Sequence, residues 1–86
     1  MPVAVKRLLL DSFKPRELSI IELSKALGSV EGVEGVDIVV IEVNSKTETI
    51  KVTIKGPQIN YNAVLKVMEK HGVSIKGVDE ISVTKT

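Results

Sequence analysis

The feature that most constrains this fold is the order of strand-like and helix-like patterns along its 86 residues. Four segments are rich in branched apolar residues, and we predict strands at 3–10, 36–43, 49–55 and 73–84. Two intervening segments repeat apolar residues every three or four positions, as amphipathic helices do. The predicted order is therefore β-α-β-β-α-β.

Both predicted helices begin at recognisable caps. Ser19 lies three residues before Glu22, the spacing of a capping box, so we expect its hydroxyl to accept from the Glu22 backbone N–H. Asn60 is the expected N-cap of the second helix. Gly32 and Gly72 are expected to stop the two helices, because glycine adopts a left-handed backbone at little cost.

Two irregular places are expected in the strands. Asp11 ends the first apolar run, and Pro15 cannot donate to a strand ladder, so residues 12–18 are predicted to be a connection. In the last strand, Val78 falls out of the alternation that the other apolar residues share. Its neighbour Gly77 therefore indicates a bulge.

This order of elements is typical of the ferredoxin-like sandwich. Two split β-α-β units give an α+β fold with a four-stranded antiparallel sheet, both helices on one face and the strand order 4-1-3-2. We find no linker-type or low-complexity segment. Residues 1–86 are therefore predicted to form a single domain.

Segment 36–43 lies at a sheet edge in this topology, yet it is apolar on both faces. Its outward residues are Val39, Ile41 and Val43. Natural proteins usually blunt such edges with charge or proline. Burying each of these side chains would contribute ~1.5–3 kcal/mol, which is comparable to the stability margin of a small domain. We therefore predict a homo-oligomer that covers Val39, Ile41 and Val43.

Composition excludes several kinds of site. The absence of cysteine excludes disulfides, thiolate metal sites and cysteine nucleophiles. The single histidine, His71, excludes a two-histidine ligand set within one chain. A net charge of +1 does not call for nucleic acid, and the two aromatic residues, Phe13 and Tyr61, both fall outside the predicted central strands. We therefore expect no nucleic-acid partner.

No segment reaches the roughly 18 consecutive apolar residues that would span a bilayer. The three leucines after Arg7 are too few for a signal peptide. We therefore expect a cytoplasmic protein that does not bind membranes.

Two groups of residues are candidates for ligand binding. Lys14 and Arg16 precede the first helix, where a small anionic ligand could also meet the helix N-terminus. The second group offers oxygen ligands that suit Ca²⁺ or Mg²⁺, although no fixed-spacing loop such as an EF-hand is present. Its carboxylates are Asp11, Asp79, Glu80 and Glu42.

Several short motifs, taken in order, resemble the small archaeal domain-of-unknown-function family 211. They lie at residues 10–15, 31–38, 47–48, 52–56 and 78–81, and the likeness covers nearly the whole chain. The resemblance implies an archaeal, soluble, ferredoxin-like protein without an established biochemical role or catalytic residues. The chain departs from the family pattern at Arg16 and at Lys76-Gly77, where relatives often have histidine. It also departs at Asn44, where an aspartate is usual.

These observations favour a non-enzymatic, self-associating domain that binds a partner or small ligand and acts in regulation. No nucleophile stands beside a base in the sequence. The alternative is a Ca²⁺- or Mg²⁺-binding protein, and we expect no other cofactor. An enzyme would have to build its site from two subunits.

Overall fold

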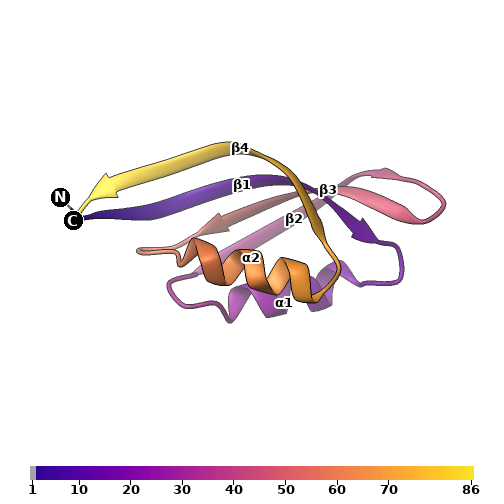
Figure 1. The fold of residues 1–86 in the computed structure, drawn as a ribbon, viewed down its shortest axis with the longest axis horizontal. Coiled ribbons are helices and arrows are strands. Elements are labelled where there is room, and N and C mark those ends of the chain that lie inside the picture. Colours follow the sequence, from indigo (N-terminus) through magenta and orange to yellow (C-terminus); the bar gives the residue numbers. More distant parts are fainter. Residues whose placement is uncertain (1) are drawn as a thin grey trace.

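The computed structural model describes residues 2–86, and its elements follow the predicted order (Figure 1). The strands are β1 (Val3–Pro15), β2 (Gly35–Val43), β3 (Thr47–Lys55) and β4 (Ser74–Lys85). The helices are α1 (Ile20–Gly28) and α2 (Tyr61–Lys70).

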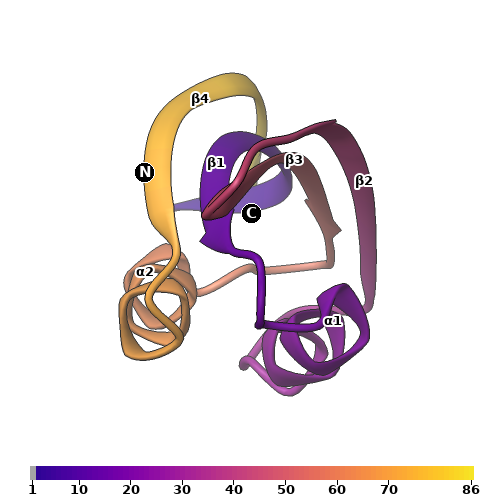
Figure 2. The ribbon, with the colours of Figure 1, turned by 90° about the vertical axis from the view of Figure 1, so that its right-hand side faces the viewer.

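The four strands form one antiparallel sheet in the order β2-β3-β1-β4, which confirms the predicted topology. Figure 2 shows both helices on the same side of the sheet, with α2 on the β4 side and α1 on the β2 side. We call this the helix-side face and the opposite one the open face. The fold is thus the ferredoxin-like α+β sandwich, with β1 and β3 central and β2 and β4 at the edges.

The core lies between the helices and the central strands. Side chains alternate between the two faces of a strand, so every second residue of β1 and β3 points to the helix side. Leu8 pairs with Ile54 and Leu10 with Val52, and all four are fully buried. The helices add Leu23, Leu27, Val64 and Met68. The alternation predicted for residues 49–55 is therefore confirmed.

The predicted helix caps are present, with one change of partner. The Asn60 side chain accepts from the Ala63 backbone N–H at 3.1 Å, as an N-cap does. The Ser19 hydroxyl accepts from the N–H of Ile21, also at 3.1 Å, and not from the residue three positions on. Gly72 follows α2 with a φ of +73°, in agreement with its predicted role.

β1 continues five residues beyond its predicted end. It pairs with β3 as far as Pro15, which lies opposite Thr47. Proline is tolerated there because its missing N–H falls at the strand end, where no interior ladder bond is lost. Ser12 and Lys14 continue the alternation on the helix-side face, and both are buried. The predicted connection at 12–18 was therefore wrong, and only residues 16–19 join β1 to α1.

The loop after α1 crosses the loop after β3 at close range. α1 ends at Gly28, earlier than expected, and Gly32 lies in the following turn with a φ of +83°. A Cβ atom on Gly32 would lie 1.7 Å from the Gln58 carbonyl oxygen. The backbone N–H of Asn60 donates to the carbonyl of Glu31 at 3.2 Å. This crossing requires glycine and ties the two helices to the same end of the sheet.

Candidate functional site

The edge strand β2 carries apolar side chains that are open to solvent. Val39 and Ile41 are each 56% exposed, and Val43 is 53% exposed. In a typical antiparallel sheet with one free face, the outward positions are polar. The solvent-exposed apolar edge expected from the sequence is therefore present.

A bulge at Ile41 changes which way these side chains face. The register with β3 shifts around Ile41, so that it has no direct partner. Val39 lies opposite Lys51 on the open face, whereas Val43 lies opposite Glu48 on the helix-side face. The prediction that all three share one face was wrong, because an extra residue inverts the alternation.

The opposite edge, β4, is apolar as well, and sequence reasoning missed it. Val78, Ile81 and Val83 are 45%, 55% and 50% exposed. In Figure 1, β4 and β1 continue together past the helices to where the chain ends meet. A two-stranded ribbon of this kind is marginally stable in water when nothing packs on it.

Two bulges in β4 explain why its pattern was hard to interpret. The register with β1 shifts at Lys76 and at Asp79, which confirms the irregularity predicted near Gly77. Their effect is that apolar residues three positions apart all point to the helix-side face. These are Ile75, Val78 and Ile81. The spacing of three residues between Ile75, Val78 and Ile81 was the one sign in the sequence that these side chains share a face.

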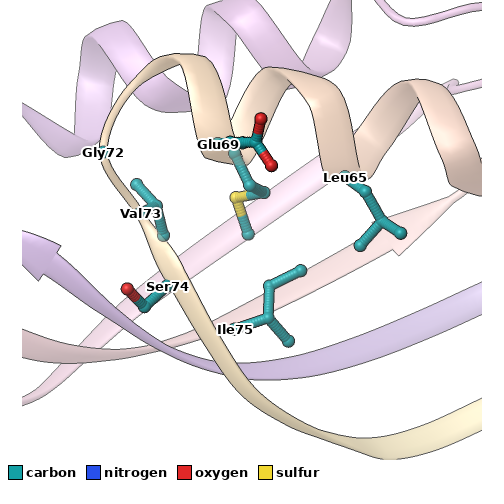
Figure 3. A pocket seen from close by; sticks show the side chains of 7 residues that line it. Leu65, Glu69, Gly72, Val73, Ser74 and Ile75 are labelled. Atoms are coloured by element: carbon teal, nitrogen blue, oxygen red, sulfur yellow. The ribbon is translucent and has the colours of Figure 1, made fainter.

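The helix layer does not close against β4. A groove of about 450 Å³ lies between α2 and the chain entering β4. Figure 3 shows the side chains of Leu65 and Glu69 on one side of it and those of Val73, Ser74 and Ile75 on the other. Its lining is mixed in polarity, and Ile75 in it lies on the same face of β4 as Val78 and Ile81.

The two residues predicted to bind an anion are not presented together. The Lys14 side chain is only 2% exposed, its Nζ lies 2.6 Å from Glu48 Oε1, and it donates to the Pro15 carbonyl at 3.1 Å. Arg16 is exposed in the turn that follows, where its backbone N–H donates to the Lys46 carbonyl. Lys14 is therefore already neutralised within the fold.

The four predicted carboxylate ligands separate into different places. Asp11 and Asp79 converge on one ammonium group, that of Lys51. Glu80 forms an ion pair with Arg7 instead.

Glu42 lies on β2, at the opposite edge of the sheet. Within residues 2–86, no three His, Cys, Asp or Glu side chains gather closely enough to hold a metal ion.

The open face around Lys51 is a network of alternating charges. The hydrogen bond that Lys51 donates to Asp79 raises the pKa of Lys51 above its ordinary value of 10.5, and the negative charges of Asp11 and Asp79 add to this effect against partial desolvation. Lys76 Nζ lies 3.9 Å from the other oxygen of Asp11. The face is therefore polar and internally compensated.

Phe13 was expected outside the central strands but belongs to β1, on the open face opposite Thr49. Lys76 Nζ lies 5.6 Å from its ring centroid, within cation–π range. Sheets that read RNA stack two or three bases on exposed aromatic residues. An RNA-binding sheet would need further exposed rings beside Phe13. Phe13 already contacts the Lys76 cation, and the other aromatic residue, Tyr61, lies on α2.

These features define a small ferredoxin-like domain whose exposed apolar groups gather at its sheet edges. The chain belongs to the domain-of-unknown-function family 211, whose model, described as uncharacterized ArCR, matches residues 6–86. An uncharacterized protein of the archaeon Methanocaldococcus jannaschii is 34% identical over 77 residues, which cover 90% of this chain and 79% of the relative. The resemblance stated from the motifs is thereby confirmed. Neither helix within residues 2–86 has the length and apolar character needed to cross a membrane.

Proposed function

We propose that this protein is a non-enzymatic domain that works by associating with further copies of itself. The observation that carries the proposal is the concentration of exposed apolar residues on both edge strands. They are Val39, Val40, Ile41, Val43, Val78, Ile81 and Val83. Each edge also presents unpaired backbone N–H and C=O groups, which favour the addition of another strand. In the cell, such an assembly would act as a binding or regulatory unit in the cytoplasm.

The chemistry available within one chain supports a binding role over catalysis. His71 caps α2, with its Nδ1 2.8 Å from the Val67 carbonyl, and Lys14 is paired with Glu48. A general base must lie within hydrogen-bond reach of the proton that it removes, and a nucleophile needs such a base beside it. Within residues 2–86, the buried Ser12 hydroxyl has no hydrogen-bond partner, so no such base activates it there.

Divalent-cation binding is less well supported than self-association. The space between Asp11 and Asp79 is spanned by Lys51, whose ammonium supplies the positive charge that a metal would bring. A bound Ca²⁺ or Mg²⁺ ion would have to displace this lysine and recruit further oxygen ligands. Thermal unfolding with and without millimolar CaCl₂ tests the alternative, because a ligand bound only to the native state raises its melting temperature.

Self-association is tested by the mass of the protein in solution. We expect light scattering at micromolar concentration to give a multiple of the 9.3 kDa chain mass. An Ile81→Lys variant should dissociate to smaller species, because a lysine in an apolar contact must bury or displace its charge. A monomeric wild-type chain would overturn the proposal.

Ile21→Lys is the matched control for this substitution. Ile21 is 64% exposed and lies on α1, two residues from the buried Leu23, so it points away from the core. It belongs to neither edge strand. Its replacement should leave the mass unchanged, which separates loss of the edge contact from a general effect of added charge.

A further inference from the structure

The two edges of the sheet match each other in their pattern of apolar side chains. On the helix-side face of β2, apolar residues form a row of four: Val36, Ile38, Val40 and Val43. On the same face of β4, a second row runs in the opposite direction: Val83, Ile81, Val78 and Ile75. Two rows of equal length on the same face can lie side by side without turning either strand over.

The two edges also match in charge. β2 contains two acids, Asp37 and Glu42, and no basic residue, while the ends of β4 carry Lys76 and Lys85. The acids of β4 are already compensated within their own chain, Asp79 by Lys51 and Glu80 by Arg7. Asp37 likewise pairs with Lys55, and Lys76 with Asp11. Among the described residues, Glu42 on β2 and Lys85 on β4 are the charges of these two strands that have no ion pair, and they are of opposite sign.

The strand directions fit as well. β2 runs antiparallel to β3, β3 to β1 and β1 to β4, so β2 and β4 of one sheet run in opposite directions. A second copy placed beside the first in the same orientation would bring its β2 antiparallel to β4. This continues the sheet across the boundary in the pattern that it already has.

We propose that β2 of one copy pairs with β4 of the next, so that the two rows meet. This pairing rests on the self-association proposed above and names the surfaces that perform it. The register places Val40 of one copy opposite Val78 of the other and Ile38 opposite Ile81. Glu42 then lies beside Lys76. Because the two surfaces differ, the contact is heterologous and repeats from copy to copy, which gives a closed ring or a filament according to its rotation.

Pairing of two identical edges, such as β2 with β2 of another copy, fits these observations less well than pairing of β2 with β4. Two β2 strands side by side would place the Glu42 carboxylates of two copies in one contact with no basic residue in either strand, since Asp37 already pairs with Lys55 on β3. A single contact of this kind would also leave the apolar row of β4 exposed. The heterologous contact covers both edges of every inner copy with one type of interface.

Cysteine cross-linking tests the pairing cleanly because the chain has no cysteine of its own. Val40→Cys and Val78→Cys are made separately, mixed, and oxidised under native conditions. We expect a disulfide-linked dimer from the mixture and none from either variant alone. A chain that carries both substitutions should give a ladder of dimers, trimers and larger species on a non-reducing gel.

The control is a mixture of Val40→Cys with Val83→Cys. The register separates these positions by several residues along the strand, beyond the Cα distance of ~7 Å that a disulfide can bridge. No dimer is expected. A dimer from this mixture in place of the first would contradict the register.

The other possible outcomes of the cross-linking experiment each contradict a different part of the proposal. Dimers from Val40→Cys alone or from Val78→Cys alone would show like edges meeting and would overturn this inference. An oligomeric mass with no cross-link in any mixture would overturn the pairing but leave self-association standing. A monomeric wild-type chain would remove both proposals.

Charge reversal gives an independent test of the register. Glu42→Lys or Lys76→Glu alone should weaken association roughly twofold to fivefold, as expected for an exposed ion pair. The double variant should recover most of the wild-type affinity in sedimentation experiments. Additive weakening in the double variant would contradict the proposed contact between Glu42 and Lys76.

Discussion

The central strands and the edge strands of this sheet are built from the same residue types but have different surroundings. Ile50 and Ile54 on β3 have no exposed surface, whereas Ile41 on β2 and Ile81 on β4 are more than half exposed. All four are isoleucines, and β2 has more branched apolar residues than β3, six in nine against three in nine, so apolar content does not decide burial. The helices pack against one part of each edge strand, where Val36, Ile38 and Ile75 are partly buried, and they leave the rest of β2 and β4 uncovered.

This contrast indicates two separate uses of apolar surface. Burial at the centre contributes ~25 cal/mol for each Å² and stabilises the single chain. Equal surface at the edges contributes nothing until another molecule covers it. The central residues should therefore control folding, and the edge residues should control association.

The largest effect is expected at the loop crossing that ties both helices to the same end of the sheet. Gly32→Ala should destabilise the protein by at least ~3 kcal/mol or prevent folding, because its Cβ would collide with the Gln58 carbonyl and its φ is positive. Gly28→Ala is the matched control, since a Cβ there meets nothing within 4 Å. It should stabilise α1 by ~0.5–1 kcal/mol. Urea unfolding of both variants measures the difference.

The contrast itself is tested by one substitution made at two places. Ile50→Ala should lower the free energy of unfolding by ~2–5 kcal/mol, because it opens a cavity in the core. Ile41→Ala should lower it by less than ~1 kcal/mol when measured on dilute protein. Similar losses at both positions would show that the edges contribute to the stability of the single chain, against the division drawn above.

A smaller effect is expected at the polar end of the central strands. Glu48→Gln removes the charge that neutralises the buried Lys14. We expect the free energy of unfolding to fall by ~2 kcal/mol. This is less than the ~3–5 kcal/mol typical of breaking a fully buried pair, because Glu48 keeps some contact with water. Replacing both partners, as Lys14→Met with Glu48→Leu, should restore most of the stability. A double variant no more stable than Glu48→Gln would count against the ion-pair explanation.

The smallest effect concerns the open face. The raised pKa of Lys51 means that its ion pairs favour the folded state below about pH 10.5, and that this contribution is lost as pH rises through the folded-state pKa. Between neutral and strongly alkaline pH, the melting temperature of the wild-type protein should therefore fall further than that of Lys51→Met. Equal losses in the two proteins would show that the network around Lys51 does not affect stability.

Much of the centre could be predicted from sequence, because its patterns are local. The period-two alternation around Ile50 and Val52 and the cap at Asn60 each depend on neighbouring residues. The end of β1 could not be predicted in this way. Lys14 is a poor candidate for a buried strand position until Glu48 is known to lie opposite it.

The edges were harder to predict because bulges decide which way their side chains point. A bulge shows in the pairing between strands and leaves little trace in a single segment. Asp79 and Lys76 look like surface charges interrupting a strand, yet each is the extra residue that keeps Ile75, Val78 and Ile81 on one face. The apolar row of β4 therefore became visible only with the register in hand.

The claim that the edges are covered by other copies is tested most directly by hydrogen exchange of backbone amides at two protein concentrations. At high concentration we predict protection of β2 and β4 that fades on dilution, while β1 and β3 stay equally protected throughout. Rapid exchange in both edge strands at every concentration would contradict the account, because unpaired edges would then be the normal state of the protein.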